Sequence, residues 1–267
     1  GAIYNIAGTV TVINSTFSNN TAIGDGSAVY NDFGTLTVTN STFSDNSATD
    51  NGTLYNGGTL TVTNSTFSGN SATNGGGIYN TGLFELSNSI AANALSGGDC
   101  VNSGTITVQN SLIEDGSCGI ISGVNGNLTG DPALNGDLTL SEGSIAINAG
   151  DNSLIPGGIT TDLAGNARIQ QTTVDMGAYE SAFIPLPVVM ISPAAFNVSE
   201  GANADFILTR TGDTTSALAV TVNITLGTDT VDADYDLAGG SISAQSGSGV
   251  TVTIPAGSAS VNVNFAA

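Results

Sequence analysis

The motif Asn-Ser-Thr-Phe-Ser recurs three times near the start of the chain, beginning at Asn14, Asn40 and Asn64. Weaker copies begin at Asn88 and Asn110, so successive starts are separated by 26, 24, 24 and 22 residues. Repeats of this length are typical of solenoids, in which each unit buries its apolar face only by stacking on its neighbours. This repetition restricts the fold more strongly than any other feature of the sequence.

Each repeat contains short segments in which apolar and polar residues alternate. In residues 34–40 this alternation predicts a half-buried strand with Leu36 and Val38 facing the core. About three such strands per repeat, separated by Gly, Asn, Asp and Ser, predict one coil of a right-handed parallel β-helix. Stacked coils place like residues about 4.8 Å apart, so side chains can pair between coils and satisfy the polar backbone of the turns. We therefore expect a phenylalanine stack of Phe17, Phe43 and Phe67 and an asparagine ladder of Asn14, Asn40, Asn64, Asn88 and Asn110.

The charged residues exclude several functions. The chain has 22 acidic residues and only two basic ones, Arg168 and Arg210, which gives a formal net charge of −20. Two cations cannot neutralise a phosphate backbone or an anionic membrane surface, so nucleic acid and anionic lipid are not expected as partners. The lack of histidine excludes His-based acid–base catalysis and His-ligated metals. No apolar run approaches the length of a membrane span, so membrane insertion of this segment is not expected.

The two cysteines, Cys100 and Cys118, lie 18 residues apart in a segment rich in Gly, Ser and Asp. This spacing suits a disulfide that closes a short loop and contributes roughly 3 kcal/mol. The composition is typical of secreted proteins, which favours the disulfide. Two unpaired small core residues are the alternative.

The repeats resemble the polymorphic outer-membrane-protein repeats of bacteria. That family is marked by a Gly-Gly-Ala-Ile type tetrad and a Phe-x-x-Asn tetrad. Here the first is matched by Gly76-Gly77-Ile78-Tyr79 and the second by residues 17–20, 43–46 and 67–70. The resemblance implies a β-helix and says less about function, because the motif residues are structural.

Residues 76–181 resemble the end of bacterial surface β-helix proteins that carry variable C-terminal anchors. The similarity lies in residues 144–150, 162–168 and 174–180 and extends back to the cysteine pair. A solenoid needs a cap on its open end, and we expect the part of this segment that follows about Gly119, where the repeat blurs, to provide it. Inside the cap, Arg168 is expected to form an ion pair with Asp175, or else with Asp162 or Glu180.

Beyond a stiff linker over residues 182–187, strands of period two return without any repeat, which predicts an antiparallel Ig-like sandwich. Residues 198–201, 206–210, 232–235 and 254–257 resemble a Calx-beta domain over residues 188–267, incomplete because the closing strands of that family are missing. The resemblance implies a Ca²⁺ site, since clustered carboxylates suit calcium; a solvated acidic loop is the alternative. The implied ligands are Glu200, Asp229, Asp232 and Asp234.

The sequence therefore predicts an all-β chain, with a capped β-helix over residues 1–181, the linker, and the incomplete sandwich. We expect an extracellular, non-enzymatic protein of the bacterial cell surface, structural or adhesin-like, whose partner is a host or matrix surface, including glycans. An enzyme is disfavoured because the first four coils contain no Lys or Arg and their acids lie in scattered turns. A polysaccharide-binding or polysaccharide-degrading β-helix is an alternative.

Ice binding by aligned outward threonines is a further alternative. Exposed threonine is also an ordinary choice in strands, and the fourth coil interrupts the array with Leu83, Glu85 and Ser87. The aligned residues are Thr9 and Thr11, Thr35, Thr37 and Thr39, Thr59, Thr61 and Thr63, and Thr105 and Thr107.

Two interpretations of the chain ends stay open. Gly1 lies within a repeat, and the second domain stops at Ala267 before its expected last strands, so both ends would offer unpaired sheet edges. If these ends belong to a subunit, copies would associate head to tail into a filament. Otherwise the chain is a fragment of a longer surface protein.

Overall fold

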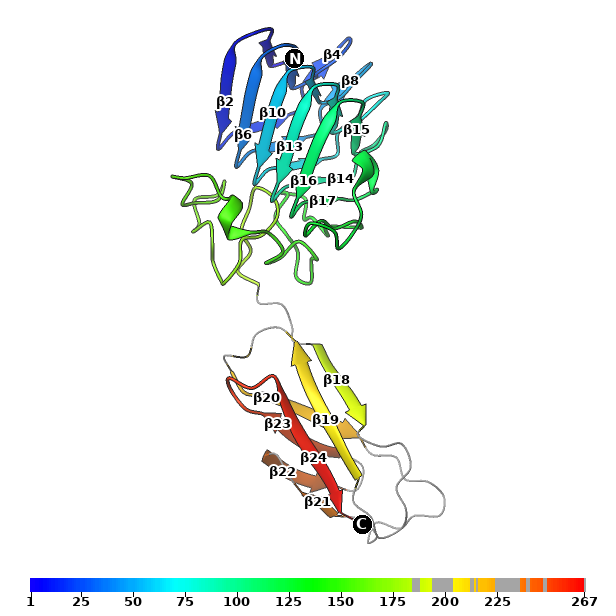
Figure 1. Ribbon diagram of the computed structural model, residues 1–267, viewed down its shortest axis with the longest axis vertical. Helices are drawn as coiled ribbons and strands as arrows, with labels where there is room; N and C mark the ends of the chain where they lie inside the picture. Colours follow the sequence, from blue (N-terminus) through cyan, green and yellow to red (C-terminus); the bar gives the residue numbers. More distant parts are fainter. Residues whose placement is uncertain are drawn as a thin grey trace. The chain divides into compact units, whose positions relative to one another are not determined.

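The computed structural model describes residues 1–183, 188–193, 204–211, 214, 216–223, 236–238, 241–246 and 249–266. The chain divides into two compact units, Gly1–Phe183 and Ile184–Ala267 (Figure 1). Strands dominate both units, and the described residues include only two short 3-10 helices, η1 (Ser117–Gly119) and η2 (Asn152–Leu154). No helix in this described part is long and apolar enough to cross a membrane. The prediction of an all-β chain with a parallel β-helix is confirmed.

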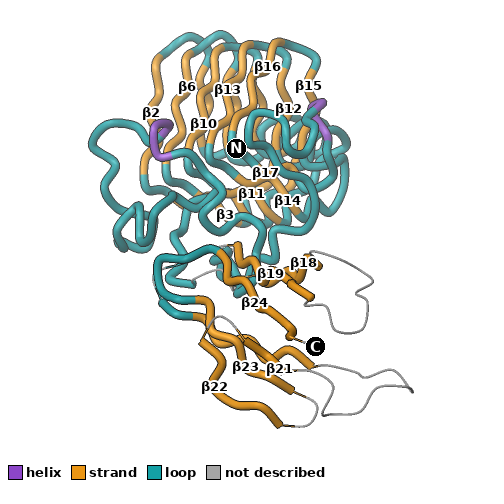
Figure 2. The backbone as a smooth tube through the Cα atoms, turned by 60° about the horizontal axis from the view of Figure 1, so that its bottom comes forward, coloured by secondary structure: helices purple, strands orange, loops and turns teal. Residues whose placement is uncertain are grey.

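The first unit is a solenoid whose strands form the walls of the coil as three five-stranded parallel sheets (Figure 2). Sheet 1 contains β1 (Ile3–Asn5), β5 (Val29–Asn31), β9 (Leu54–Asn56), β12 (Ile78–Asn80) and β15 (Cys100–Asn102). Sheet 2 contains β2 (Thr9–Ile13), β6 (Thr35–Thr39), β10 (Thr59–Thr63), β13 (Leu83–Ser87) and β16 (Thr105–Gln109). Sheet 3 contains β3 (Thr16–Ser18), β7 (Thr42–Ser44), β11 (Thr66–Ser68), β14 (Ile90–Ala92) and β17 (Leu112–Ile113). A further pair, β4 (Thr21–Ala22) and β8 (Ser47–Ala48), joins the first two coils.

The inner faces of the three sheets form one continuous apolar core. Leu36 and Val38 of β6 pair in register with Leu60 and Val62 of β10, and all four side chains are fully buried. Each coil is too small to bury these side chains alone, so their burial depends on the coils above and below. The stacking of like on like is what turns the sequence repeat into a core.

A stack of phenylalanines lies on the inner side of sheet 3. The ring centroids of Phe17 and Phe43 are 4.8 Å apart, and those of Phe43 and Phe67 are 4.5 Å apart, with nearly parallel rings. In the next two coils the same position holds Ala91 and Ile113. The stack therefore covers three coils, and smaller side chains continue the core beyond it.

Each coil turns from sheet 2 into sheet 3 at an asparagine followed by a serine. The corner asparagines have left-handed backbone with φ between 43° and 54°, a conformation that asparagine tolerates better than most residues. From the second coil onward, the serine Oγ accepts a hydrogen bond from the backbone N–H of the matching serine in the preceding coil, as from Ser15 to Ser41 at 3.1 Å. The repeated Asn-Ser pair thus supplies the turn and a bond between coils. The corner asparagines are Asn14, Asn40, Asn64, Asn88 and Asn110.

The segment that follows the fifth coil closes the core and then runs along its side. Cys118 and Ile120 pack against the solenoid core, and Leu128 pairs with Leu112 as the start of a sixth turn. Residues 130–181, here called the lateral segment, contact Asn40 in the second coil and Asn88 in the fourth. The part of the expected cap that follows residue 130 thus lies along the side of the solenoid.

The lateral segment covers an apolar patch on the outside of sheet 3. The outward position that holds Thr16, Thr42 and Thr66 in the first three coils holds Ile90 and Leu112 in the next two. Removing this apolar surface from water favours a cover on that side. Ile90 and Leu112 form a second buried cluster with Leu140, Ala146, Ile147 and Met176 of the lateral segment.

The described residues of the second unit form two antiparallel sheets. One has the order β18 (Val188–Pro193), β19 (Ala204–Thr211), β24 (Ser260–Ala266) and β21 (Asp236–Ala238); the other has β20 (Leu218–Asn223), β23 (Gly249–Ile254) and β22 (Ser241–Ser246). Both sheets contribute to one small core formed by Phe206, Leu208, Val252, Ile254 and Val263. The predicted linker falls mainly on residues 184–187, which lie outside the described residues, so it stays a prediction.

Candidate functional site: solenoid faces and a buried ion cluster

An asparagine ladder crosses the solenoid, but not at the predicted positions. It is formed by the last residue of each sheet 1 strand, whose Nδ2 donates to Oδ1 in the next coil at 2.7–2.8 Å. Its members are Asn5, Asn31, Asn56, Asn80 and Asn102.

In the predicted ladder of corner asparagines, only Asn40 and Asn14 are joined to each other, at 2.6 Å. Asn40 and Asn88 bond to the lateral segment instead. Both side-chain polar atoms of Asn64 lack a partner in the described part of the chain. The left-handed corner backbone makes these residues turn formers, which is why the ladder runs elsewhere.

A second, shorter ladder uses the asparagine of the Phe-x-x-Asn tetrad. Asn20 donates to Asn46 at 2.9 Å, and Asn46 donates to Asn70 at 3.0 Å. Asn46 and Asn70 also donate to the carbonyls of the phenylalanines in the preceding coils, Phe17 and Phe43. The tetrad is therefore one structural device, in which the aromatic ring fills the core and the amide ties its backbone to the next coil.

Cys100 and Cys118 form a disulfide between β15 and η1. Beside it, Asp99 and Asp115 accept each other's backbone N–H, at 3.0 Å and 3.1 Å. Burial raises the pKa of Asp99 to about 6, although a backbone hydrogen bond from Ala94 acts in the opposite direction. These two carboxylates hold the chain around the disulfide.

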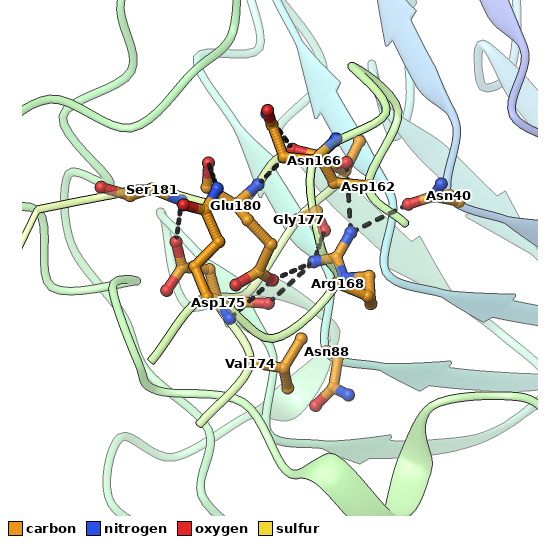
Figure 3. Close-up of polar contacts among 12 residues, drawn as sticks. Asn40, Asn88, Asp162, Asn166, Arg168, Val174, Asp175, Gly177, Glu180 and Ser181 are labelled. Atoms are coloured by element: carbon orange, nitrogen blue, oxygen red, sulfur yellow. Dashed lines mark hydrogen bonds and ion pairs between the residues drawn. The ribbon is translucent and has the colours of Figure 1, made fainter. Parts of the chain in front are cut away.

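One buried arginine, Arg168, which is 2% exposed, adds to the contacts that hold the lateral segment on the solenoid. Its Nη1 donates to Oδ1 of Asn40 at 2.8 Å, and its Nη2 makes an ion pair with Oε1 of Glu180 at 2.7 Å (Figure 3). The same guanidinium donates to the backbone carbonyls of Asp175, Gly177 and Ala178. A single side chain therefore connects the second coil to the end of the lateral segment.

The predicted ion pair between Arg168 and Asp175 is wrong, because the pair is made with Glu180. The carboxylate of Asp175 instead accepts backbone N–H groups from Asn148 and Ser181, both at 2.6 Å. The longer side chain of Glu180 reaches the guanidinium that the short, already bonded Asp175 does not.

The ion cluster carries more negative than positive groups, because Asp162, Asp175 and Glu180 are all buried around one guanidinium. Burial raises the pKa of Glu180 to about 8, against the lowering effect of Arg168, and burial also raises the pKa of Asp175. Desolvation outweighs the attraction here because each buried carboxylate loses its water and faces further carboxylates. The cluster therefore links the lateral segment to the solenoid through carboxyl groups, Asp175 and Glu180, whose pKa values burial raises.

The outer face of sheet 2 presents aligned threonines. Thr11, Thr37 and Thr61 stand in register as one column, and Thr9, Thr35 and Thr59 as another. The fourth coil replaces these columns with Leu83 and Glu85, and the fifth coil resumes them with Thr105 and Thr107. In the third column Thr39 and Thr63 are each only 4% exposed. The exposed threonine array thus has two columns instead of three, and the fourth coil interrupts both of them.

The outer face of sheet 1 presents an aromatic column that the sequence analysis did not assign to any site. Ring centroids follow one another at 4.9, 4.7 and 5.7 Å, with interplanar angles of 13°, 5° and 16°. The first ring is 69% exposed and the others are half-buried. The repeated Tyr-Asn pair was the available signal, because the asparagine faces inward and its neighbour must face outward. This tyrosine column consists of Tyr4, Tyr30, Tyr55 and Tyr79.

The predicted calcium ligands Glu200, Asp229, Asp232 and Asp234 lie outside the described residues. Within the residues that are described, no group of three or more His, Cys, Asp or Glu side chains is arranged to hold a metal ion. The calcium site and the absence of an enzymatic activity stay predictions.

The family model of the Chlamydia polymorphic membrane protein repeat matches residues 14–32 and 64–81. Each match begins at a corner asparagine, crosses sheet 3 and ends just beyond sheet 1. The solenoid is a polymorphic-membrane-protein-like β-helix. No curated protein and no solved structure matches the chain. The polymorphic-membrane-protein matches lie within the first four coils, so the Calx-beta resemblance of the second unit stays a prediction.

Proposed function

We propose that this protein is an extracellular, non-enzymatic element of a bacterial cell surface with an adhesin-like role. The observation that carries the proposal is the match of two coils to the Chlamydia polymorphic membrane protein repeat. The disulfide also fits an oxidising extracellular compartment.

The distribution of covered and uncovered faces supports the same role. The chain uses its own lateral segment to cover sheet 3. Tyrosines of sheet 1 and threonines of sheet 2 stay exposed or half-exposed in ordered columns. Rigid, regular faces of this kind are suited to contact with another surface, and loops would not hold the groups in register.

For the second unit we propose an Ig-like sandwich of the Calx-beta type that acts as a spacer. The two antiparallel sheets with a shared core support this assignment. A calcium titration of the full chain, followed by its melting temperature, tests the Ca²⁺ ligands predicted between residues 200 and 234. A rise in melting temperature with calcium is expected, and no change would remove the metal from the proposal.

Ice binding is a second candidate function, favoured by the two in-register threonine columns of sheet 2. Leu83 and Glu85 interrupt the flat array in the fourth coil, so we rank it below adhesion. A thermal-hysteresis measurement on the full chain decides the matter, because an array that binds ice must produce hysteresis. Association of copies into filaments likewise stays a proposal, which electron microscopy of the full chain tests.

Adhesion is tested with beads that carry the full chain, applied under flow to host-cell monolayers and to extracellular-matrix coatings. We expect retention above that of beads carrying albumin and of beads carrying the reduced, heat-unfolded chain. Equal retention of all three bead types on every coating would refute the adhesin-like role.

A further inference from the structure

The tyrosine column has unused hydrogen-bonding capacity. None of its four hydroxyl groups has a hydrogen-bond partner within the part of the chain that the structure describes. Because the rings of Tyr30 and Tyr55 turn their faces to neighbouring rings, they present their edges to solvent. The outside of sheet 1 is therefore a line of phenol groups repeated at the spacing of the coils.

Glycine turns and exposed residues border the column. On one side the chain enters each sheet 1 strand through a glycine turn, and a Cβ at Gly52 would lie 2.9 Å from the Cβ of Tyr79. No side chain can therefore stand at this point of the column. On the other side lie Asp32 and Phe33, the latter 76% exposed. The column is thus bordered by backbone, a carboxylate and apolar surface.

The charge of the molecule restricts what this surface can bind. The only two basic side chains, Arg168 and Arg210, are 2% and 3% exposed, so the chain offers no arginine or lysine to an anionic ligand. With a net charge of −20, an acidic polymer would be repelled. Cationic groups bind aromatic rings through their faces, and both faces of Tyr30 and Tyr55 are occupied within the stack. An uncharged ligand remains.

The regular spacing points to a ligand that is itself repetitive. The ring centroids of the four tyrosines follow one another at 4.9, 4.7 and 5.7 Å. All four phenol groups can make the same contact only with a polymer whose repeat is similarly short. A sugar chain offers hydroxyl groups that donate to and accept from phenols, together with C–H surface for the ring edges. Tyrosine provides both contacts and loses little side-chain entropy on binding.

We infer that the tyrosine column binds a linear, uncharged polysaccharide laid along the solenoid axis. This inference rests on the proposed adhesin-like function and names the class of ligand at the contact surface. Burial, followed by the nearby charge of Asp32, raises the pKa of Tyr30, so its hydroxyl group stays protonated and able to donate in physiological conditions.

The chain carries its own reporter for this test, because it has no tryptophan and four of its six tyrosines lie in the column. Tyrosine fluorescence of the full chain is titrated with three neutral hexasaccharides, cellohexaose, chitohexaose and maltohexaose, and with the acidic hexamer of galacturonate. At least one neutral hexamer is expected to change the emission and to bind, while the galacturonate hexamer does not. No binding by the three neutral hexamers, or equal binding of the acidic one, would overturn the inference.

Paired variants separate binding from folding. The double change Tyr30→Phe and Tyr55→Phe keeps the stacked rings but removes two hydroxyl groups, and we expect about tenfold weaker binding of the neutral hexamer. Tyr179→Phe, at a half-buried tyrosine of the lateral segment, is the matched control and should leave binding unchanged. Unchanged affinity in the double variant also overturns the inference.

The bead assay distinguishes failure of this inference from failure of the proposed function. If beads with the full chain adhere while no neutral hexamer binds, the inference is wrong and the adhesin-like role stands. If beads do not adhere, the adhesin-like role fails, and the hexamer titration alone then decides the sugar site.

Discussion

Replacement of Arg168 by methionine tests the role of the buried ion cluster most directly. Methionine keeps a long, flexible and apolar stem but removes the charge and every hydrogen bond of the guanidinium. In the native protein that group pairs with Glu180 and donates to Asn40 and to three backbone carbonyls. Its loss leaves three buried carboxylates without any cation.

The expected cost follows from this geometry. Removing one partner of a buried ion pair destabilises proteins by about 3–5 kcal/mol, mainly because the other charge stays buried. Glu180 can limit this cost by taking up a proton, since burial already raises its pKa to about 8. Above about pH 8, where Glu180 of the native chain is ionised, we therefore expect Arg168→Met to lower the free energy of unfolding of the first unit by about 4 kcal/mol. In a Glu180→Gln background the same change should cost only about half as much, because less charge is left unpaired.

Urea unfolding above about pH 8, where Glu180 is ionised, measures the two costs, and hydrogen exchange followed by mass spectrometry shows where the protein opens. Loss of protection should be concentrated in residues 144–181. Arg210→Met is the matched control, because Arg210 is also buried and donates to four backbone carbonyls in the second unit; it should leave the first unit unchanged. A cost of Arg168→Met below about 1 kcal/mol, or an equal cost with and without Glu180, would refute the argument.

Three further outcomes are expected. The stability of the first unit should fall as pH rises from 5 to 8, because the unfolded chain releases the proton of Glu180 near pH 4.5 while the folded chain keeps it to about 8; a flat melting temperature across this range in the native chain, or an undiminished slope in Glu180→Gln, would contradict this. Asn56→Ala should cost about 2–3 kcal/mol in urea unfolding, because it breaks two rungs of the buried ladder and removes one hydrogen-bond partner from each neighbour; a cost no larger than that of Asn20→Ala, which breaks one half-buried rung, would count against the ladder. Phe43→Ala should cost about 3–5 kcal/mol, and clearly more than Phe17→Ala, whose ring has one stacked neighbour instead of two; equal costs would mean that stacking contributes little.

The strands and the core of the solenoid were predictable because their signal is local and repeated. The alternation around Leu36 and Val38 fixes which side chains face inward, and stacking then carries that assignment from coil to coil. The phenylalanine stack follows from the same spacing. Repetition removes most of the ambiguity that a single short strand would leave.

The ladder was misplaced because spacing alone does not show which asparagine in a coil faces inward. Asn40 recurs as regularly as Asn31, but it stands at a corner with φ of 54°. The alternation Val29, Tyr30, Asn31 contained the answer, since an asparagine two residues after a buried valine shares its face. That reading would also have placed Tyr30 outside.

The lateral segment and the partner of Arg168 depend on tertiary contacts that no local pattern specifies. The change from Thr66 to Ile90 and Leu112 at an outward position was the visible sign that sheet 3 needs a cover. Three acids within reach of Arg168 in the sequence left the choice of ion pair open. The carboxylate of Asp175 is already bonded to backbone N–H groups, so Glu180 forms the ion pair with Arg168. This arrangement is visible only in the folded structure.

The contacts of the lateral segment have a consequence for how such a chain can change its length. Arrays of coils can gain or lose a whole unit, because each unit meets only its neighbours. Here the side chain of Asn40 donates to the carbonyl of Thr161, and that of Asn88 donates to the carbonyl of Asp151. The corner of Asn64 lies between these two contact points. Deleting the coil between them would bring the two contact points closer by one strand spacing, about 4.8 Å. The lateral segment could then no longer make both contacts in its present conformation. The lateral segment therefore fixes the number of coils between its two contact points. Coils can be duplicated without this constraint only before Asn40.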